Sequence, residues 1–190
     1  HKDLKSLWLP YTQMKGLGSL NKAIKTKNSR IFLNNGTSLV DGIASWWTAC
    51  HGYNNSHIRK KVLEQLNIMP HVMFGGLIHD QAISLSKRLS TNLNNKLEKV
   101  FFSDSGSVSV EIALKMSIQY WLNKGKKNKN RFVFFKNGYH GDTSAAMAIC
   151  DPEEGMHSLF KGYLNKNFML QIPDNEIDKN NLIKLLRINK

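Results

Sequence analysis

Residues 99–111 read Lys-Val-Phe-Phe-Ser-Asp-Ser-Gly-Ser-Val-Ser-Val-Glu, and this stretch decides how the rest of the sequence is interpreted. The apolar run Val100–Phe102 predicts a buried strand, and the spacing after it predicts a helix from about Ser107 to Leu122. A small-residue turn that leads from a strand into a helix brings free backbone N–H groups and the positive end of the helix dipole to one point. Gly106 lets a ligand approach the backbone closely, and Ser107 adds a hydroxyl. The stretch therefore predicts a seat for a phosphate group.

A second turn of this kind follows the next apolar run. Residues 131–135 predict another strand, the turn 137–143 reads Asn-Gly-Tyr-His-Gly-Asp-Thr, and residues 143–149 are typical of a short helix. The order strand, helix, strand, turn, helix predicts an α/β fold with a parallel sheet, whose ligands lie at the carboxyl ends of the strands. Both turns would lie at that edge.

The residue types at this edge favour some phosphorylated ligands over others. Tyr139 would offer an aromatic face beside the phosphate seat, which suits pyridoxal phosphate as one option. The patterns Gly-x-x-x-x-Gly-Lys and Gly-x-Gly-x-x-Gly, which are typical of ATP and dinucleotide sites, are absent. The histidines lack the spacing of a metal site, so no metal is expected.

The remaining segments predict further elements around this unit. Asn34-Asn35-Gly36 between two apolar runs is a hairpin signal, with strands at 30–33 and 37–40. Apolar periodicity and capping residues predict helices over 56–69, 80–93 and 181–188, and an apolar run predicts a strand over 168–172.

Three side chains have an ordinary interpretation as well as a functional one. Glu111 is placed to pair with Lys115 one helical turn later on the surface. The adjacent Trp46 and Trp47 point to opposite sides of an extended chain, which leaves core packing and ligand contact both open.

The charge of the chain raises nucleic acid as a partner. Its 190 residues contain 27 Lys and Arg against 14 Asp and Glu, for a net charge of +13. Lys far outnumbers Arg, however, whereas proteins that read phosphates and bases favour the bidentate Arg side chain. Cys50 and Cys150 fit no disulfide framework, which predicts a reducing, cytoplasmic setting, and no apolar run is long enough to cross a membrane.

Several stretches together resemble the class III pyridoxal-phosphate aminotransferases. They occur in the family's order: Trp8-Leu9-Pro10-Tyr11-Thr12, Leu39-Val40-Asp41-Gly42 with Ser45-Trp46-Trp47, His51-Gly52-Tyr53-Asn54, His71-Val72-Met73-Phe74-Gly75-Gly76, Asp104-Ser105-Gly106-Ser107-Val108, Asn137-Gly138-Tyr139-His140-Gly141-Asp142-Thr143 and Met156-His157-Ser158. The resemblance implies fold type I of the pyridoxal-phosphate transferases. Residues 1–50 would be an extended segment and hairpin of the small domain, and residues 51–190 the first part of the large, cofactor-binding domain.

The resemblance also implies a chemistry and its cofactor. The stretches are most similar to the branch that moves the amino group of S-adenosylmethionine to 8-amino-7-oxononanoate in biotin synthesis. Gly106 and Ser107 would hold the phosphate of pyridoxal phosphate, and Tyr139 would lie near its ring. The family is a homodimer with active sites at the subunit interface.

Substrate-binding residues follow from the same resemblance. Trp46 would line the substrate pocket, Tyr139 would contact the oxononanoate, and Tyr11 would help to recognise both substrates. Trp47 and Asp142 are expected as pocket neighbours.

The family's catalytic lysine has no matching position in these residues. An aminotransferase needs a lysine that joins the cofactor covalently and a carboxylate against the pyridine nitrogen, and both lie downstream in this family. We therefore expect residues 1–190 to be an N-terminal portion, inactive alone. Two alternatives stay open: a class III aminotransferase with another substrate, such as an ω-amino acid, and a basic nucleic-acid-binding module.

Overall fold

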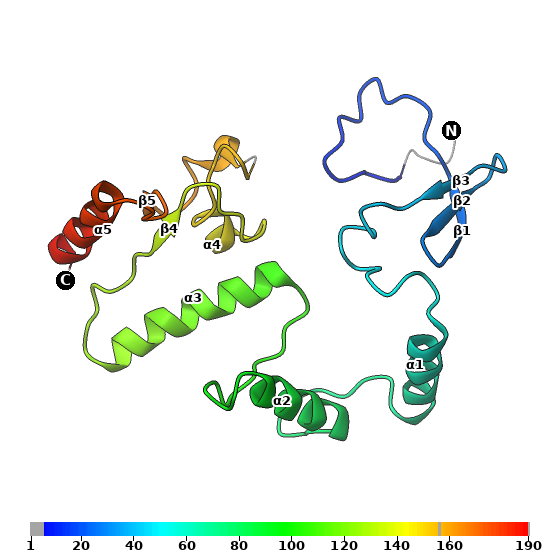
Figure 1. The fold of residues 1–190 in the computed structure, drawn as a ribbon, viewed down its shortest axis with the longest axis horizontal. Coiled ribbons are helices and arrows are strands. Elements are labelled where there is room, and N and C mark those ends of the chain that lie inside the picture. Colours follow the sequence, from blue (N-terminus) through cyan, green and yellow to red (C-terminus); the bar gives the residue numbers. More distant parts are fainter. Residues whose placement is uncertain (1–5, 156, 190) are drawn as a thin grey trace. The chain divides into compact units, whose positions relative to one another are not determined.

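The computed structural model describes residues 6–155 and 157–189, so the first five residues of the predicted 1–50 segment and Met156 lie outside it. The chain divides into two compact units, one up to His79 and one from Asp80 onward (Figure 1). Each unit is described by itself. The assignment of residues 1–50 and 51–190 to two functional domains stays a prediction.

The first unit contains a three-stranded antiparallel sheet in the order β1-β2-β3. Its strands are β1 (Ala23–Lys27), β2 (Arg30–Leu33) and β3 (Ser38–Val40). The hairpin predicted around Asn34-Asn35-Gly36 is confirmed, with Gly36 at φ +85°. Strand β1 was not predicted, because its sequence Ala-Ile-Lys-Thr-Lys has too few apolar residues and only its pairing with β2 identifies it.

Helix α1 (Ser56–Ile68) completes the first unit and confirms the predicted helix. Its cap is Asn55, whose side chain accepts hydrogen bonds from the N–H groups of His57 at 3.1 Å and Ile58 at 3.2 Å. The chain then passes Pro70 and leaves the helix, as the proline requires.

The second unit carries the helix predicted after the first turn, and the strand and short helix predicted around the second turn. Its helices are α2 (Asp80–Asn92), α3 (Gly106–Asn123), α4 (Ser144–Met147) and α5 (Glu176–Ile188), and its strands are β4 (Val133–Phe135) and β5 (Phe168–Leu170). Strands β4 and β5 pair in parallel, with Phe134 opposite Met169. Helix α4 contacts α3, and α5 contacts β5 (Figure 1).

The strand predicted at Val100–Phe102 is wrong. This segment enters α3 without a strand assignment, because a strand needs a hydrogen-bonded neighbour and the described residues supply none beside it. The long helix after the turn is confirmed, and it begins at Gly106, one residue before the predicted start.

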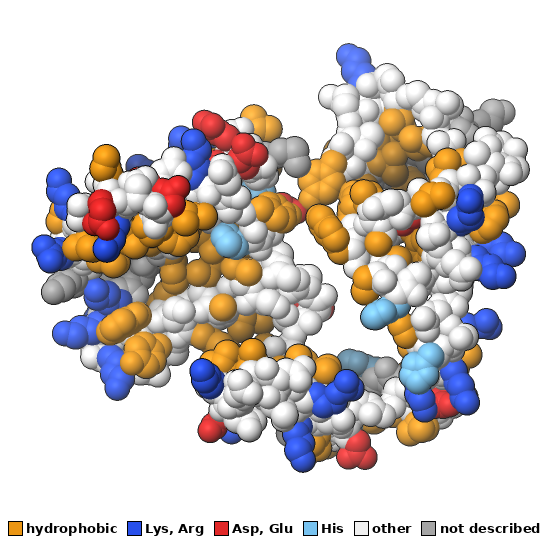
Figure 2. Space-filling view, viewed as in Figure 1, with side chains coloured by type: hydrophobic (Ala, Val, Ile, Leu, Met, Phe, Trp, Pro, Cys, Tyr) orange, Lys and Arg blue, Asp and Glu red, His pale blue; other side chains and the backbone are white. Residues whose placement is uncertain are grey.

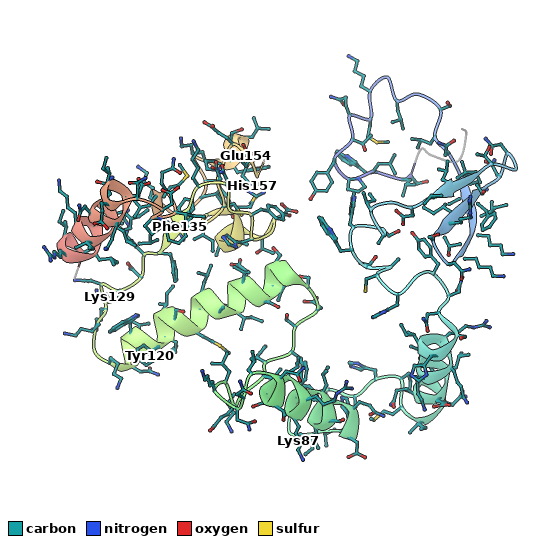
Figure 3. The ribbon with its side chains drawn as sticks, in the orientation of Figure 1. Lys87, Tyr120, Lys129, Phe135, Glu154 and His157 are labelled. Carbon is teal, nitrogen blue, oxygen red and sulfur yellow. The ribbon has the colours of Figure 1, made fainter. Side chains whose placement is uncertain are left out.

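Most fully buried side chains gather at one place in the second unit. Ala146, the run 148–151 and His157 are buried, and they lie under the loop between β4 and α4. Figure 3 shows His157 in the segment that follows this run. The best-packed part of the unit therefore supports the second of the two predicted turns.

Candidate functional site

The start of α3 has the geometry of an anion seat. Ser105 is the cap, with its hydroxyl accepting the Val108 N–H at 3.2 Å. The N–H groups of Gly106 and Ser107 lie in the first turn, where no helical carbonyl is in position to accept them. A Cβ placed on Gly106 would meet nothing within 4 Å, so the space beside the Gly106 backbone is open. An anion at this point would gain two N–H groups and the helix dipole.

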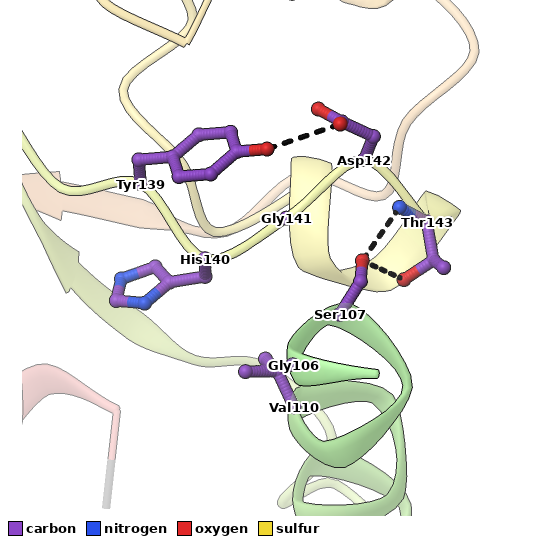
Figure 4. Close-up of a pocket in the computed structure, with 8 residues that line it drawn as sticks. All are labelled: Gly106, Ser107, Val110, Tyr139, His140, Gly141, Asp142 and Thr143. Atoms are coloured by element: carbon purple, nitrogen blue, oxygen red, sulfur yellow. Dashed lines mark hydrogen bonds between the residues drawn. The ribbon is translucent and has the colours of Figure 1, made fainter. Parts of the chain in front are cut away.

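The loop from Tyr139 to Thr143 faces this seat and lines an open cavity with it (Figure 4). The cavity measures about 580 Å³ and is lined by residues 139–143 with Gly106, Ser107 and Val110. The Tyr139 ring is 58% exposed, so its face is accessible to a ligand in the cavity. The structure therefore brings together four residues that the sequence singled out: Gly106, Ser107, Tyr139 and Asp142.

Ser107 joins the two walls of the cavity. Its hydroxyl accepts the Thr143 N–H at 3.0 Å and lies 3.1 Å from the Thr143 hydroxyl (Figure 4). Gly141 makes this closeness possible: it adopts φ +123°, and a Cβ there would lie 2.2 Å from the Ser107 hydroxyl oxygen. The Ser107 side chain thus fixes the loop, while its backbone N–H remains available to a ligand.

Glu111 makes a second tie between α3 and the loop. Its carboxylate accepts the Ala145 N–H at 3.2 Å, at the first turn of α4. The interpretation of Glu111 as a surface partner of Lys115 is therefore wrong. No ion pair joins the two within residues 6–155 and 157–189.

Two buried side chains hold the loop from below. Asp151, 2% exposed, accepts the Asn137 N–H at 2.9 Å, and Cys150, also 2% exposed, receives the His140 N–H on its sulfur at 3.1 Å. The Asn137 N–H bond is the main cause that lowers the pKa of Asp151 below its ordinary value, so its carboxylate is the favoured form. Neither residue was predicted, since the sequence around them shows no periodicity.

His157 supports Asp142 and Tyr139 from the side. It is 4% exposed, and its Nε2 lies 2.9 Å from one Asp142 carboxylate oxygen, while the Tyr139 hydroxyl donates to the other oxygen at 3.0 Å. The rings of His157 and Tyr139 are stacked at 6.1 Å between centroids. Because Asp142 accepts at both oxygens, it orients the tyrosine hydroxyl beside the cavity. His157 appeared in the sequence only within the stretch Met156-His157-Ser158.

The other predicted substrate residues lie in the first unit. Tyr11 and Trp46 make an edge-to-face contact with ring centroids 6.1 Å apart. Trp46 is 59% exposed and Trp47 84% exposed, so neither is a core residue there. The expectation of an extended chain at the tryptophans is wrong, because residues 44–47 all adopt positive φ, between +47° and +69°.

This left-handed turn is held by a group of three side chains, Asp41, Ser45 and Tyr53, which we call the clasp. One Asp41 oxygen accepts the Ser45 N–H at 2.7 Å, the Ser45 hydroxyl and the Tyr53 hydroxyl. The Tyr53 hydroxyl bond is the main cause that lowers the pKa of Asp41, and the same bond raises the pKa of Tyr53. A non-glycine residue in this region costs roughly 1–2 kcal/mol, so the turn depends on such contacts.

Solved structures share this fold. The chain superimposes on the adenosylmethionine-8-amino-7-oxononanoate aminotransferase of Methanocaldococcus jannaschii with a TM-score of 0.88 and 30% identity, over 97% of this chain and 42% of the other. An ω-transaminase from Pseudomonas jessenii, solved in complex with PMP, gives a TM-score of 0.81 and 26% identity, over 90% of this chain and 38% of that one. The fold is therefore that of the transaminases.

The sequence matches the same class. The model of the aminotransferase class-III family matches residues 16–189, and the chain belongs to this family. It is similar to the adenosylmethionine-8-amino-7-oxononanoate aminotransferase of Buchnera aphidicola subsp. Schizaphis graminum, with 41% identity over 177 residues. That match covers 93% of this chain and 41% of the relative, so the chain spans about two fifths of the length of such relatives.

Other kinds of site find little support in the described part of the chain. No three His, Cys, Asp or Glu side chains converge there in a way that would hold a metal ion, and no helix there is long and apolar enough to cross a membrane. On the face shown in Figure 2, Lys and Arg side chains are spread over both units among polar and acidic groups.

Proposed function

We propose that the protein containing this chain is a pyridoxal-phosphate-dependent aminotransferase. In this proposal it moves the amino group of S-adenosylmethionine to 8-amino-7-oxononanoate, in biotin synthesis, as a cytoplasmic homodimer. The observation that carries the proposal is the anion seat at α3 facing an exposed tyrosine, in a chain 41% identical to a relative of that name.

The residues of the second unit fit the cofactor. A phosphate at the start of α3 would accept the N–H groups of Gly106 and Ser107, and the missing side chain at Gly106 leaves it room. The Tyr139 ring would lie beside the flat heterocycle, with its hydroxyl oriented by Asp142. When bound, pyridoxal phosphate supplies the electron-withdrawing ring that carries the amino group between donor and acceptor.

The residues of the first unit would serve the substrates. Trp46 and Tyr11 present aromatic surface, and we assign them to recognition of the amino acceptor and of the donor's adenine. Trp47 is proposed as a neighbour in the same pocket. The covalently bonded lysine and the carboxylate against the pyridine nitrogen are proposed to lie beyond Lys190.

The test begins with the complete reading frame. We expect it to continue to a strand-borne Asp and then a loop Lys, and the purified full-length product should convert 8-amino-7-oxononanoate when S-adenosylmethionine is supplied. A stop codon directly after Lys190, or a full-length protein that binds pyridoxal phosphate without forming product from these substrates, would contradict the assignment.

A second candidate is a class III aminotransferase for another substrate, such as an ω-amino acid. The similarity to the ω-transaminase of Pseudomonas jessenii favours it. Replacement of Trp46 and of Tyr11 in the full-length protein separates the two candidates. If neither replacement lowers the rate with oxononanoate while an ω-amino acid is the better donor, the second candidate holds.

A further inference from the structure

We propose that Asp41 and Tyr53 are positioning residues that hold the substrate-facing tryptophans through the left-handed turn at residues 44–47. The proposal rests on the proposed function, because it assigns the turn to the amino-acceptor side of that site. It concerns two residues that touch neither the cavity at α3 nor, in this proposal, the substrate. Their effect on the reaction passes through Trp46 and Trp47.

The clasp stands on a firm base in the sheet. The Asp41 N–H donates to the Ser29 carbonyl at 2.8 Å, directly after β3. The backbone of Tyr53 exchanges two hydrogen bonds with that of Asn28. The Tyr53 N–H donates to the Asn28 carbonyl at 2.7 Å, and the Tyr53 carbonyl accepts the Asn28 N–H at 3.1 Å. Both ends of the clasp are therefore attached to the turn between β1 and β2, which fixes the distance between them.

The turn needs this support because its residue types oppose its conformation. Ala44, Ser45, Trp46 and Trp47 all lie in the left-handed region, and none is a glycine. Asp41 accepts the N–H groups of Ile43 at 3.3 Å and Ser45 at 2.7 Å, so it holds the entry to the turn. Without the Tyr53 hydroxyl, the Asp41 carboxylate is no longer bonded to Tyr53, whose backbone is fixed to Asn28. The four residues of the turn can then relax to ordinary φ values.

Relaxation of the turn would move the indole rings of Trp46 and Trp47 out of their present orientation. Successive left-handed residues direct side chains differently from an extended strand, and here they leave both indoles exposed with the Tyr11 ring against Trp46. A wall held in this form before the substrate arrives avoids an ordering cost at binding. The clasp should therefore set the affinity for the amino acceptor and leave the chemical step unchanged.

The test uses the full-length protein with three variants. Tyr53→Phe removes only the hydroxyl, and Ala44→Gly combined with Tyr53→Phe relieves the left-handed strain at residue 44 without restoring the clasp. Tyr163→Phe is the matched control, since that ring is 75% exposed and its hydroxyl bonds to none of the residues that the structure describes. Each protein is labelled with 5-fluorotryptophan for ¹⁹F NMR and assayed for KM and kcat.

We expect Tyr53→Phe to shift or broaden the Trp46 and Trp47 signals and leave those of Trp8 and Trp121 unchanged. Its KM for 8-amino-7-oxononanoate should rise roughly tenfold, as expected for a lost hydrogen bond to a charged group, while kcat changes less than about twofold. The double variant should recover part of both effects, because strain at one of the four left-handed residues is relieved, and a general loss of structure would not allow this recovery. Tyr163→Phe should behave as the unchanged protein.

The two readouts separate this proposal from the proposed function. If the unchanged protein has no aminotransferase activity, the proposed function fails, and the NMR signals still decide whether the clasp holds the tryptophans. If Tyr53→Phe leaves the Trp46 and Trp47 signals in place, or if Ala44→Gly does not recover them, the clasp does not position these residues and the proposal is overturned.

Discussion

Replacement of Gly141 by alanine should separate the loop from helix α3 and so open the anion seat. The added Cβ would lie 2.2 Å from the Ser107 hydroxyl oxygen and 2.8 Å from the Ser107 Cα, which is backbone that cannot swing aside. The loop must then move, breaking both Ser107–Thr143 contacts and the Glu111–Ala145 bond at about 1 kcal/mol each. The φ of +123° adds about 1–3 kcal/mol for a residue with a side chain. The sum is about 4–6 kcal/mol.

Urea unfolding of the full-length protein measures the loss of stability, and a spectroscopic titration measures the affinity for pyridoxal phosphate. Gly125→Ala is the control, because Gly125 also has positive φ, +73°, but a Cβ there meets nothing within 4 Å. It should cost only about 1 kcal/mol and leave cofactor affinity unchanged. If the free energies of unfolding of Gly141→Ala and Gly125→Ala differ by less than about 1 kcal/mol and the two variants bind the cofactor equally well, the close contact between Gly141 and Ser107 does not hold the seat together.

Three further variants test the site. His157→Leu should weaken cofactor binding and alter the absorbance band of the cofactor, because Asp142 loses its buried donor. His157→Gln has an amide that can replace the Nε2–H, so it should retain most of the affinity and of the absorbance band. Equal loss in the two variants would count against orientation of Asp142 by His157. Ser107→Ala should lower the free energy of unfolding in urea by about 1–3 kcal/mol, because the hydroxyl that accepts the Thr143 N–H is lost. Most of the affinity for the cofactor phosphate should remain, because the backbone N–H is still present. A complete loss of this affinity in a stable protein would show that the hydroxyl itself binds phosphate. The lowered pKa of Asp41 means that the clasp contributes stability above the ordinary carboxyl pKa of about 3.9 and loses it as the pH falls through the lower, folded-state value. Tryptophan fluorescence followed from pH 7 to pH 2 should therefore change only in the acid range, and a transition at the same pH in Asp41→Asn would exclude this carboxylate as its source.

Local signals in the sequence predicted the framework of the site. Helix α3 was predictable because a small-residue turn precedes it and apolar residues follow at helical spacing, and the β2–β3 hairpin because Asn-Gly favours a tight turn. The pairing of Gly106 and Ser107 with the Tyr139 loop also followed from the βα order. For the helix and the hairpin, the information lies within a few residues of the element that it specifies.

The parts that escaped prediction depend on partners distant in sequence. Val100–Phe102 is apolar like a strand, but strand formation requires a neighbour that the residues themselves cannot indicate. Cys150 and Asp151 fasten the loop through bonds to residues 10 and 14 positions earlier, in segments without periodicity. The left-handed turn at residues 44–47 was the least predictable feature, since no glycine marks it and the clasp that helps to hold it includes Tyr53, which lies outside the turn.

The ties from α3 to the loop have a consequence for the order in which the site can form. Ser107 and Glu111 reach residues 36 and 34 positions later, so α3 can form by local contacts long before its seat has a second wall. The cavity exists only after β4 and the loop have folded back onto the helix. A ligand that needs both walls binds the folded unit and not the open one, and its binding energy is added to the stability of the whole unit. Slowed hydrogen exchange at Thr143 and Ala145 on addition of pyridoxal phosphate would measure this coupling directly.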